Sequence, residues 1–161
     1  MDWREIDKYT SFKDHLIAFL CSSRSTMRMH QILAERAFKN KSKASIHSTL
    51  QRLKRENLIT NTDGWLLTDK GVKYYENKLL FTPLSSPFKK EDLKNIVLAF
   101  DIPEPERRKR NWLRNQLKIY GYTMVQRSLW QGPGPLPEEF KKRAGQLKIS
   151  KNIKTFKITN K

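Results

Sequence analysis

The chain has 161 residues with a single cysteine, Cys21, and three histidines without metal-ligand spacing, which excludes a disulfide framework and makes a zinc site improbable. It has no apolar run of about 18 residues and no signal-peptide core, so we expect a cytoplasmic protein without a membrane partner. Lysine and arginine outnumber aspartate and glutamate by 33 to 16, giving a formal net charge of +17. This excess favours nucleic acid as the partner, with a ribosomal-type or merely solvated basic surface as the alternative.

Each half of the chain has its own apolar pattern, so we predict two domains. Residues 1–80 form the first domain, residues 81–93 a linker rich in proline and serine, and residues 94–161 the second domain. The second half is the more basic, because residues 94–161 contain 16 lysines and arginines but only five acidic residues.

The first half begins with helical patterns. Residues 1–11 are polar apart from Trp3 and Ile6 and form either a short helix or an arm. Apolar side chains recur at helical spacing over Phe12–Ser22 and again over Met29–Phe38, which predicts two amphipathic helices.

A third helix is predicted from Ser42, a candidate N-cap, because Ile46, Leu50 and Leu53 have the spacing of a core-facing stripe. Its other face consists of side chains that can reach base edges or phosphates: Lys43, Ser45, His47, Ser48, Gln51, Arg52 and Arg55. Only Glu56 is acidic there, whereas a helix that meets only solvent usually includes more carboxylates. We therefore predict that these residues bind DNA, with an ordinary solvated face as the alternative.

The next stretch predicts a hairpin followed by a helix. Leu58–Thr60 and Trp65–Thr68 flank a turn that ends in Asp63-Gly64, and a helix opens at Asp69 and continues to Leu80. Residues 12–80 are similar to the winged helix-turn-helix domains of many bacterial repressors. That resemblance implies that the third helix enters the major groove and that the hairpin touches the DNA backbone. Trp65 is assigned to the core.

In the second half, Ile96–Ile102 reads as a strand that stops before Pro103. Its alternation places Leu98 and Phe100 on one face and Val97, Ala99 and Asp101 on the other. A helix is predicted over Pro105–Tyr120, and one stripe of this helix is basic: Arg107, Arg110, Arg114 and Lys118. The remaining elements are one strand or a bent pair over Thr123–Gln131, a helix over Leu136–Leu147 and a closing strand over Asn152–Thr159. The order β-α-β(β)-α-β is the ferredoxin-like arrangement.

The segments Phe100-Asp101-Ile102-Pro103 and Gln126-Arg127-Ser128-Leu129-Trp130 carry a second resemblance. They resemble the central domain of the phenylacetate repressor (PaaX) family and, more distantly, the smaller subunit of the CRISPR spacer-integration complex. The resemblance covers residues 94–161. It implies an α+β protein in which a winged helix-turn-helix precedes a ferredoxin-like dimerisation domain. We therefore predict a homodimeric transcriptional repressor that binds double-stranded DNA, with a sequence-blind DNA-bridging adaptor as an alternative.

Asp101 is the residue that could support catalysis. In the CRISPR subunit, the matching aspartate is proposed to hold a divalent metal at the dimer axis. Mg²⁺ needs several oxygen ligands, but the nearby sequence offers Glu104, Glu106 and Ser128 and no second aspartate. We therefore expect no catalytic residue, metal or cofactor, with a Mg²⁺-dependent nuclease that uses Asp101 as the alternative. If Asp101 has a structural role and no catalytic one, it ends the strand and either accepts a hydrogen bond from the following helix or pairs with Arg127.

Two surface predictions complete the analysis. Val97 and Ala99 are apolar on the sheet face that two crossover helices cannot cover, which predicts a homodimer through that face. The stripe of Arg107, Arg110, Arg114 and Lys118 is predicted to contact DNA phosphates without regard to sequence, or else to be a solvated face. The sequence identifies no small-molecule effector.

Overall fold

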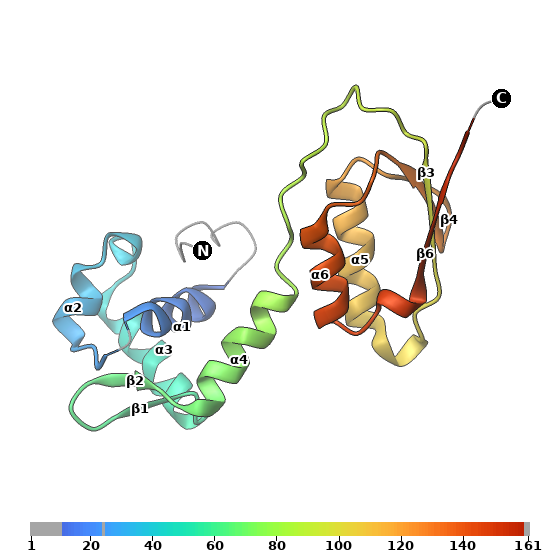
Figure 1. Cartoon of the computed structure of the whole chain (residues 1–161). Coiled ribbons are helices and arrows are strands. Elements are labelled where there is room, and N and C mark those ends of the chain that lie inside the picture. The colour runs from blue at the N-terminus through green and yellow to red at the C-terminus, as the bar shows by residue number, and fades with distance from the viewer. Residues whose placement is uncertain (1–10, 24, 160–161) are drawn as a thin grey trace. The chain divides into compact units, whose positions relative to one another are not determined.

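The computed structural model describes residues 11–23 and 25–159, and the chain divides into two compact units, one ending at Thr82 and the other beginning at Pro83 (Figure 1). Apart from Ser11, the stretch expected to be a short helix or an arm lies outside the described residues. In the part of the chain that is described, no helix is long and apolar enough to cross a membrane.

The first unit contains helices and a hairpin, in the order α1 (Phe12–Ser23), α2 (Met29–Ala34), η2 (Arg36–Phe38), α3 (Lys43–Arg55), β1 (Ile59–Asn61), β2 (Trp65–Leu67) and α4 (Asp69–Leu80). The predicted first, third and fourth helices and the hairpin are confirmed. The prediction of one helix over Met29–Phe38 is wrong. Glu35 adopts an extended backbone with ψ of 124°, so α2 ends at Ala34 and the chain re-enters as one 3₁₀ turn. This break brings Phe38 edge-on to the rings of Phe12 and Phe19.

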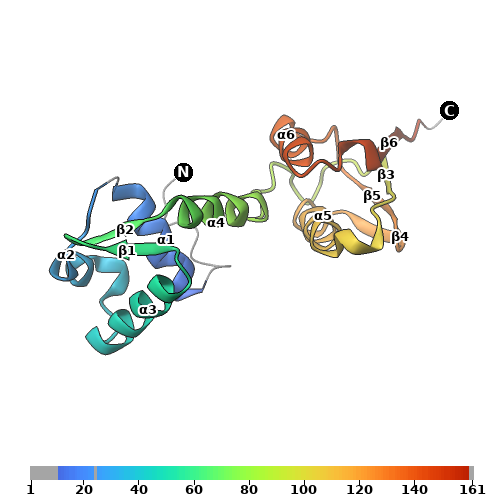
Figure 2. The same ribbon diagram turned by 90° about the horizontal axis from the view of Figure 1, so that it is seen from below.

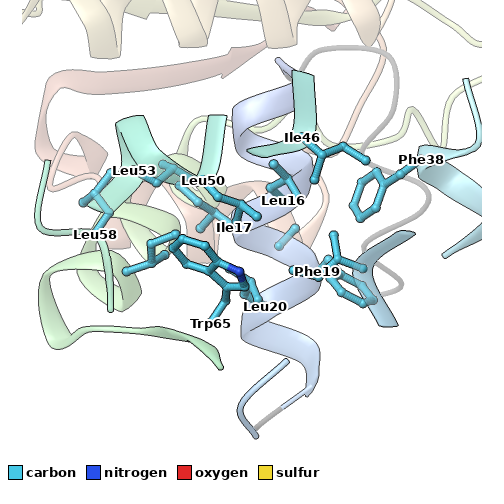
Figure 3. Close-up of a cluster of buried hydrophobic side chains, with 13 residues drawn as sticks. Leu16, Ile17, Phe19, Leu20, Phe38, Ile46, Leu50, Leu53, Leu58 and Trp65 are labelled. Atoms are coloured by element: carbon cyan, nitrogen blue, oxygen red, sulfur yellow. The ribbon is translucent and has the colours of Figure 1, made fainter. Parts of the chain in front are cut away.

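The core of the first unit is built around α1, whose residues Leu16–Leu20 are all buried (Figure 3). The apolar stripe of α3 packs into the same cluster, because Ile46, Leu50 and Leu53 are fully buried as the spacing predicted. Trp65 is 4% exposed, which confirms its assignment to the core. Each such large side chain stabilises the fold by about 1.5 to 3 kcal/mol, so the orientation of α3 is strongly determined by its apolar side.

A third extended segment, which the sequence did not predict, pairs with the hairpin. Met27 and Trp65 exchange both backbone N–H···O hydrogen bonds at 2.9 Å. Gly64 lies beside this pairing with φ of +143°, and a Cβ there would meet Thr26 at 3.1 Å. Glycine is therefore needed at this turn, both for the backbone angle and for the close approach.

The second unit contains β3 (Ile96–Phe100), η3 (Glu104–Glu106), α5 (Arg107–Ile119), β4 (Thr123–Gln126), β5 (Leu129–Gly132), α6 (Glu138–Gln146), η4 (Ser150–Asn152) and β6 (Ile153–Lys157). The strand order is β4-β5-β3-β6 with antiparallel neighbours, which is the predicted ferredoxin-like arrangement. Several predicted boundaries move by one or two residues. The first strand ends at Phe100, and the helix predicted from Pro105 opens as a 3₁₀ turn and becomes α-helical at Arg107.

Helices α5 and α6 cover the same face of this sheet (Figures 1 and 2). Leu98, Phe100 and Trp130 are buried on the covered face, and the ring of Trp112 in α5 stacks on Phe140 in α6 at 5.9 Å between ring centroids. Val97 is only partly buried, and it lies on the opposite face, as predicted.

The expected linker, residues 81–93, contains a segment from Pro83 onwards that is anchored in the second unit. The side chain of Gln116 accepts a hydrogen bond from the backbone N–H of Leu84 at 2.7 Å and donates to its carbonyl at 2.9 Å. Gln116 is 0% exposed and Leu84 is buried. The ring of Phe88 packs edge-on against Tyr120. These contacts tie the start of the second unit to α5.

Candidate nucleic-acid interface

The polar face of α3 is open to solvent in the first unit. Ser42 caps the helix as predicted, since its Oγ accepts a hydrogen bond from the backbone N–H of Ser45 at 3.1 Å. Ser45 is half-buried, and the other predicted contact residues are exposed: Lys43, His47, Ser48, Gln51, Arg52 and Arg55. Lys54 is also exposed but was not among the predicted contact residues. Its position on the same helix could have placed it there.

Within the described residues, neighbouring carboxylates leave the positive charge on α3 unneutralised. Glu56, the acidic residue at the end of the helix, forms an ion pair of 2.5 Å with Lys13 of α1. Among the described residues, Arg52 and Arg55 have no carboxylate partner within salt-bridge distance. Cations without internal partners remain available to a polyanion.

The middle of this face carries a pair of polar side chains one turn apart. Gln51 Nε2 lies 3.3 Å from His47 Nε2, so the two side chains can share a hydrogen bond. Ser48 Oγ donates to the carbonyl of Ser45 at 3.1 Å and keeps its lone pairs free to accept. Amide, imidazole and hydroxyl groups together offer donors and acceptors, which is what contact with base edges requires.

The hairpin has a different character. No lysine or arginine occurs from Ile59 to Leu67, and the turn contains Asp63. Any contact between this hairpin and DNA would depend on neutral donors such as Asn61 and Thr62, which are exposed. The positive charge of the first unit therefore lies outside this hairpin.

The basic stripe of α5 is less uniform than the sequence suggested. Arg107 and Lys118 are exposed, but Arg110 has a side chain that is only 13% exposed and lies 2.7 Å from Glu104. Arg110 also donates to the carbonyl of Ile102 at 3.2 Å. The hydrogen bond that Arg110 donates to Glu104, and then the positive charge of Arg110, hold the pKa of Glu104 below its usual range.

Three members of the stripe line an open cavity of about 650 Å³ beside the β4–β5 hairpin. Its lining consists of Glu104, Arg110, Arg114, Lys118, Tyr122, Met124, Arg127 and Trp130. Arg127 and Trp130 were not predicted as site residues. The alternation of side chains along the hairpin could have predicted the position of Trp130. Trp130 pairs with Leu98 and Met124 and therefore lies on the helix-covered face of the sheet.

Asp101 lies beyond the end of β3 and is exposed. Its backbone is fixed by Asn152, which accepts a hydrogen bond from the Asp101 N–H at 2.9 Å and donates from Nδ2 to the Asp101 carbonyl at 2.6 Å. Neither predicted side-chain interaction is seen, since within the described residues the carboxylate has no hydrogen bond from the following helix and no ion pair with Arg127. No group of three or more His, Cys, Asp or Glu side chains in the described ranges is placed to hold a metal ion.

The strand order and the paired helices define the second unit as a ferredoxin-like domain. Residues 90–161 match the family model described as the PaaX protein central Cas2-like domain, so this part of the chain is similar to that domain. The match confirms the resemblance drawn from the sequence for this half and does not extend into the first unit. No curated protein and no solved structure matches the chain.

Proposed function

We propose that this protein is a PaaX-like transcriptional repressor that binds double-stranded DNA sequence-specifically as a homodimer. The observation that carries the proposal is the exposed face of α3, which joins unneutralised cations to a group of neutral hydrogen-bonding side chains. Phosphate contacts give affinity and base contacts give sequence choice, and this one helix offers residues suited to both.

The arrangement of the first unit supports the same conclusion. Helix α2 and its 3₁₀ extension precede α3, and the β1–β2 hairpin follows, which is the element order of a winged helix-turn-helix. In that fold α3 is the recognition helix and enters the major groove. His47, Ser48 and Gln51 then face bases, while Lys43, Arg52 and Arg55 contact phosphates, with Ser45 at the edge of the contact.

Dimerisation is assigned to the open face of the sheet in the second unit. Phe156 is 57% exposed and Ile158 is 42% exposed. Phe156 lies directly opposite Val97 in the ladder and therefore shares its face, with Ala99 two residues along. An apolar face of this kind is an unfavourable surface for a monomer and suits an isologous two-fold contact.

Val97→Lys tests the dimer. The added ammonium groups would lie near the two-fold contact, so the wild-type chain should sediment as a dimer at tens of micromolar and the variant as a monomer. Gln146→Lys is the matched control, because Gln146 is already exposed and belongs to α6, which covers the opposite face of the sheet. A wild-type chain that sediments as a monomer would rule out the dimer.

The basic stripe of α5 supplies a second, sequence-blind contact with DNA phosphates. Its exposed members Arg107 and Lys118 would reach the backbone, with Arg114 and the clamped Arg110 adding charge behind them. Each phosphate neutralised steepens the fall of log K with log salt by about 0.9, so Arg107→Ser with Lys118→Ser should flatten the slope by up to roughly 2. The preferred sequence should not change, and an unaltered slope would mean that the stripe only faces solvent.

Selection of bound duplexes from a random pool tests the proposed function as a whole. A repressor of this kind should enrich a palindrome whose half-sites are spaced by about one helical turn or a multiple of it. Strong binding without any enriched motif would instead indicate an adaptor that bridges DNA regardless of sequence.

A further inference from the structure

The cavity beside the β4–β5 hairpin contains two buried hydrogen-bond donors without acceptors. Within the described residues, Nε of Arg110 and Nε1 of Trp130 are buried and have no hydrogen-bond partner. Both side chains line the cavity, and Trp130 is 2% exposed. A buried donor left without an acceptor is destabilising, so an acceptor that reaches these donors would be bound favourably.

The charge of the cavity defines what that acceptor should be. Glu104 is the one carboxylate in the lining, and it is occupied by the terminal nitrogens of Arg110 at 2.7 Å. Arg114, Lys118 and Arg127 have no carboxylate partner within the described residues. Arg114 is held in place by the carbonyl of Arg127 at 3.4 Å and by the ring of Phe100, 5.8 Å from its guanidinium. The lining therefore keeps an excess of positive charge that its own carboxylate does not offset.

Part of the cavity wall is apolar, and that part is held by close contacts. Tyr122 packs on Gly132, where a Cβ would come within 2.3 Å of its ring, and its hydroxyl donates to the carbonyl of Pro133 at 2.6 Å. Met124 and Trp130 add further apolar surface to the lining. A volume of about 650 Å³ falls within the range of small-molecule sites, roughly 300 to 1,000 Å³.

We propose that this cavity binds a small organic anion whose carboxylate or phosphoryl oxygens accept hydrogen bonds from Trp130 Nε1 and the surrounding cations. A phosphate of duplex DNA is a poorer fit, because the backbone of a duplex meets exposed guanidinium groups and does not reach a donor that is buried beneath them. The site thus goes beyond the proposed DNA contacts of the stripe, and its binding does not depend on the repressor function.

The indole N–H of Trp130 provides a direct reporter. In ¹H–¹⁵N spectra of the full ¹⁵N-labelled chain, sodium phosphate or sodium acetate should move the Trp130 indole peak along a saturating curve. Sodium chloride at the same ionic strength should not move it, and neither anion should move the peak of Trp65, which is in the core of the first unit. Trp130→Phe identifies the peak, or through-bond assignment does so if that variant does not fold. Response to phosphate alone or to acetate alone identifies the oxyanion class.

Two matched variants connect the shift to the cavity. Arg127→Gln changes an exposed residue in the β4–β5 turn, and it should raise the half-saturating concentration about tenfold or more, the loss of one charge-assisted hydrogen bond. Lys142→Gln removes the same charge from an exposed position on α6 outside the cavity and should leave the curve unchanged.

Three results would overturn the proposal. The first is a Trp130 peak that neither anion moves, and the second is an equal response to chloride. The third is a duplex that moves the peak at a lower phosphate concentration than free phosphate does, which would assign the cavity to DNA. If the wild-type chain shows the anion response but selects no DNA sequence, only the proposed repressor function is overturned. The two proposals can therefore fail separately.

Discussion

Replacing Gln51 by alanine separates sequence reading from folding. Gln51 is exposed, and its side-chain amide lies 3.3 Å from His47 on the same helix. Alanine is the better helix former and leaves no cavity, so the free energy of unfolding should change by no more than about 0.5 kcal/mol. If the amide contacts one base pair in a bidentate manner, discrimination at that position should fall by about 1 to 3 kcal/mol, roughly 5- to 150-fold.

The assay compares binding to the selected duplex with binding to each single-base-pair variant at one fixed salt concentration. Arg55→Ala is the contrasting control, because loss of a phosphate contact should weaken all duplexes to a similar extent and flatten the salt slope by about 0.9. Thermal unfolding of both variants checks that the fold is unchanged. If Gln51→Ala and His47→Ala both leave the preferred motif as it was, α3 does not read the sequence.

Three further predictions concern the structure that positions these surfaces. Burial raises the pKa of Asp14, but the ion pair with Lys78 at 3.1 Å and hydrogen bonds from Ser11 and Tyr74 together bring it below its ordinary value of 3.8. Because the pKa is lowered in the folded state, this stabilisation is present above about pH 4 and is lost as the pH falls further. Asp14→Asn should therefore reduce the pH dependence of the free energy of unfolding in acid. A free energy that varies with pH as in the wild-type chain would contradict this. Gln116→Leu leaves the Leu84 backbone groups buried without partners and should cost about 2 to 5 kcal/mol in chemical denaturation, whereas a cost under 1 kcal/mol would mean that the clamp does not matter. Ser42→Ala removes the cap of α3 and should cost about 1 kcal/mol, with Ser42→Thr as the control that retains a hydroxyl.

Local sequence patterns predicted where several helices and strands lie and which of their sides are buried. The spacing of Ile46, Leu50 and Leu53 and the hydroxyl of Ser42 predicted both the start of α3 and the side it buries. These features were readable because helical periodicity and capping depend on residues within a few positions of one another. The alternation that begins at Ile96 predicted the faces of β3 for the same reason.

Tertiary structure decided the features that depend on residues far apart in the chain. The break at Glu35 accompanies the packing of Phe38 against α1, and no local signal ends that helix. The clamp between Gln116 and Leu84 joins positions 32 residues apart. The cavity likewise combines α5 with the β4–β5 hairpin, whereas the sequence placed Arg110 in a row of cations that face DNA phosphates or solvent. Its partial burial follows only from the tertiary packing around α5, because a pattern along the chain shows which residues share a face and not which distant side chains meet there.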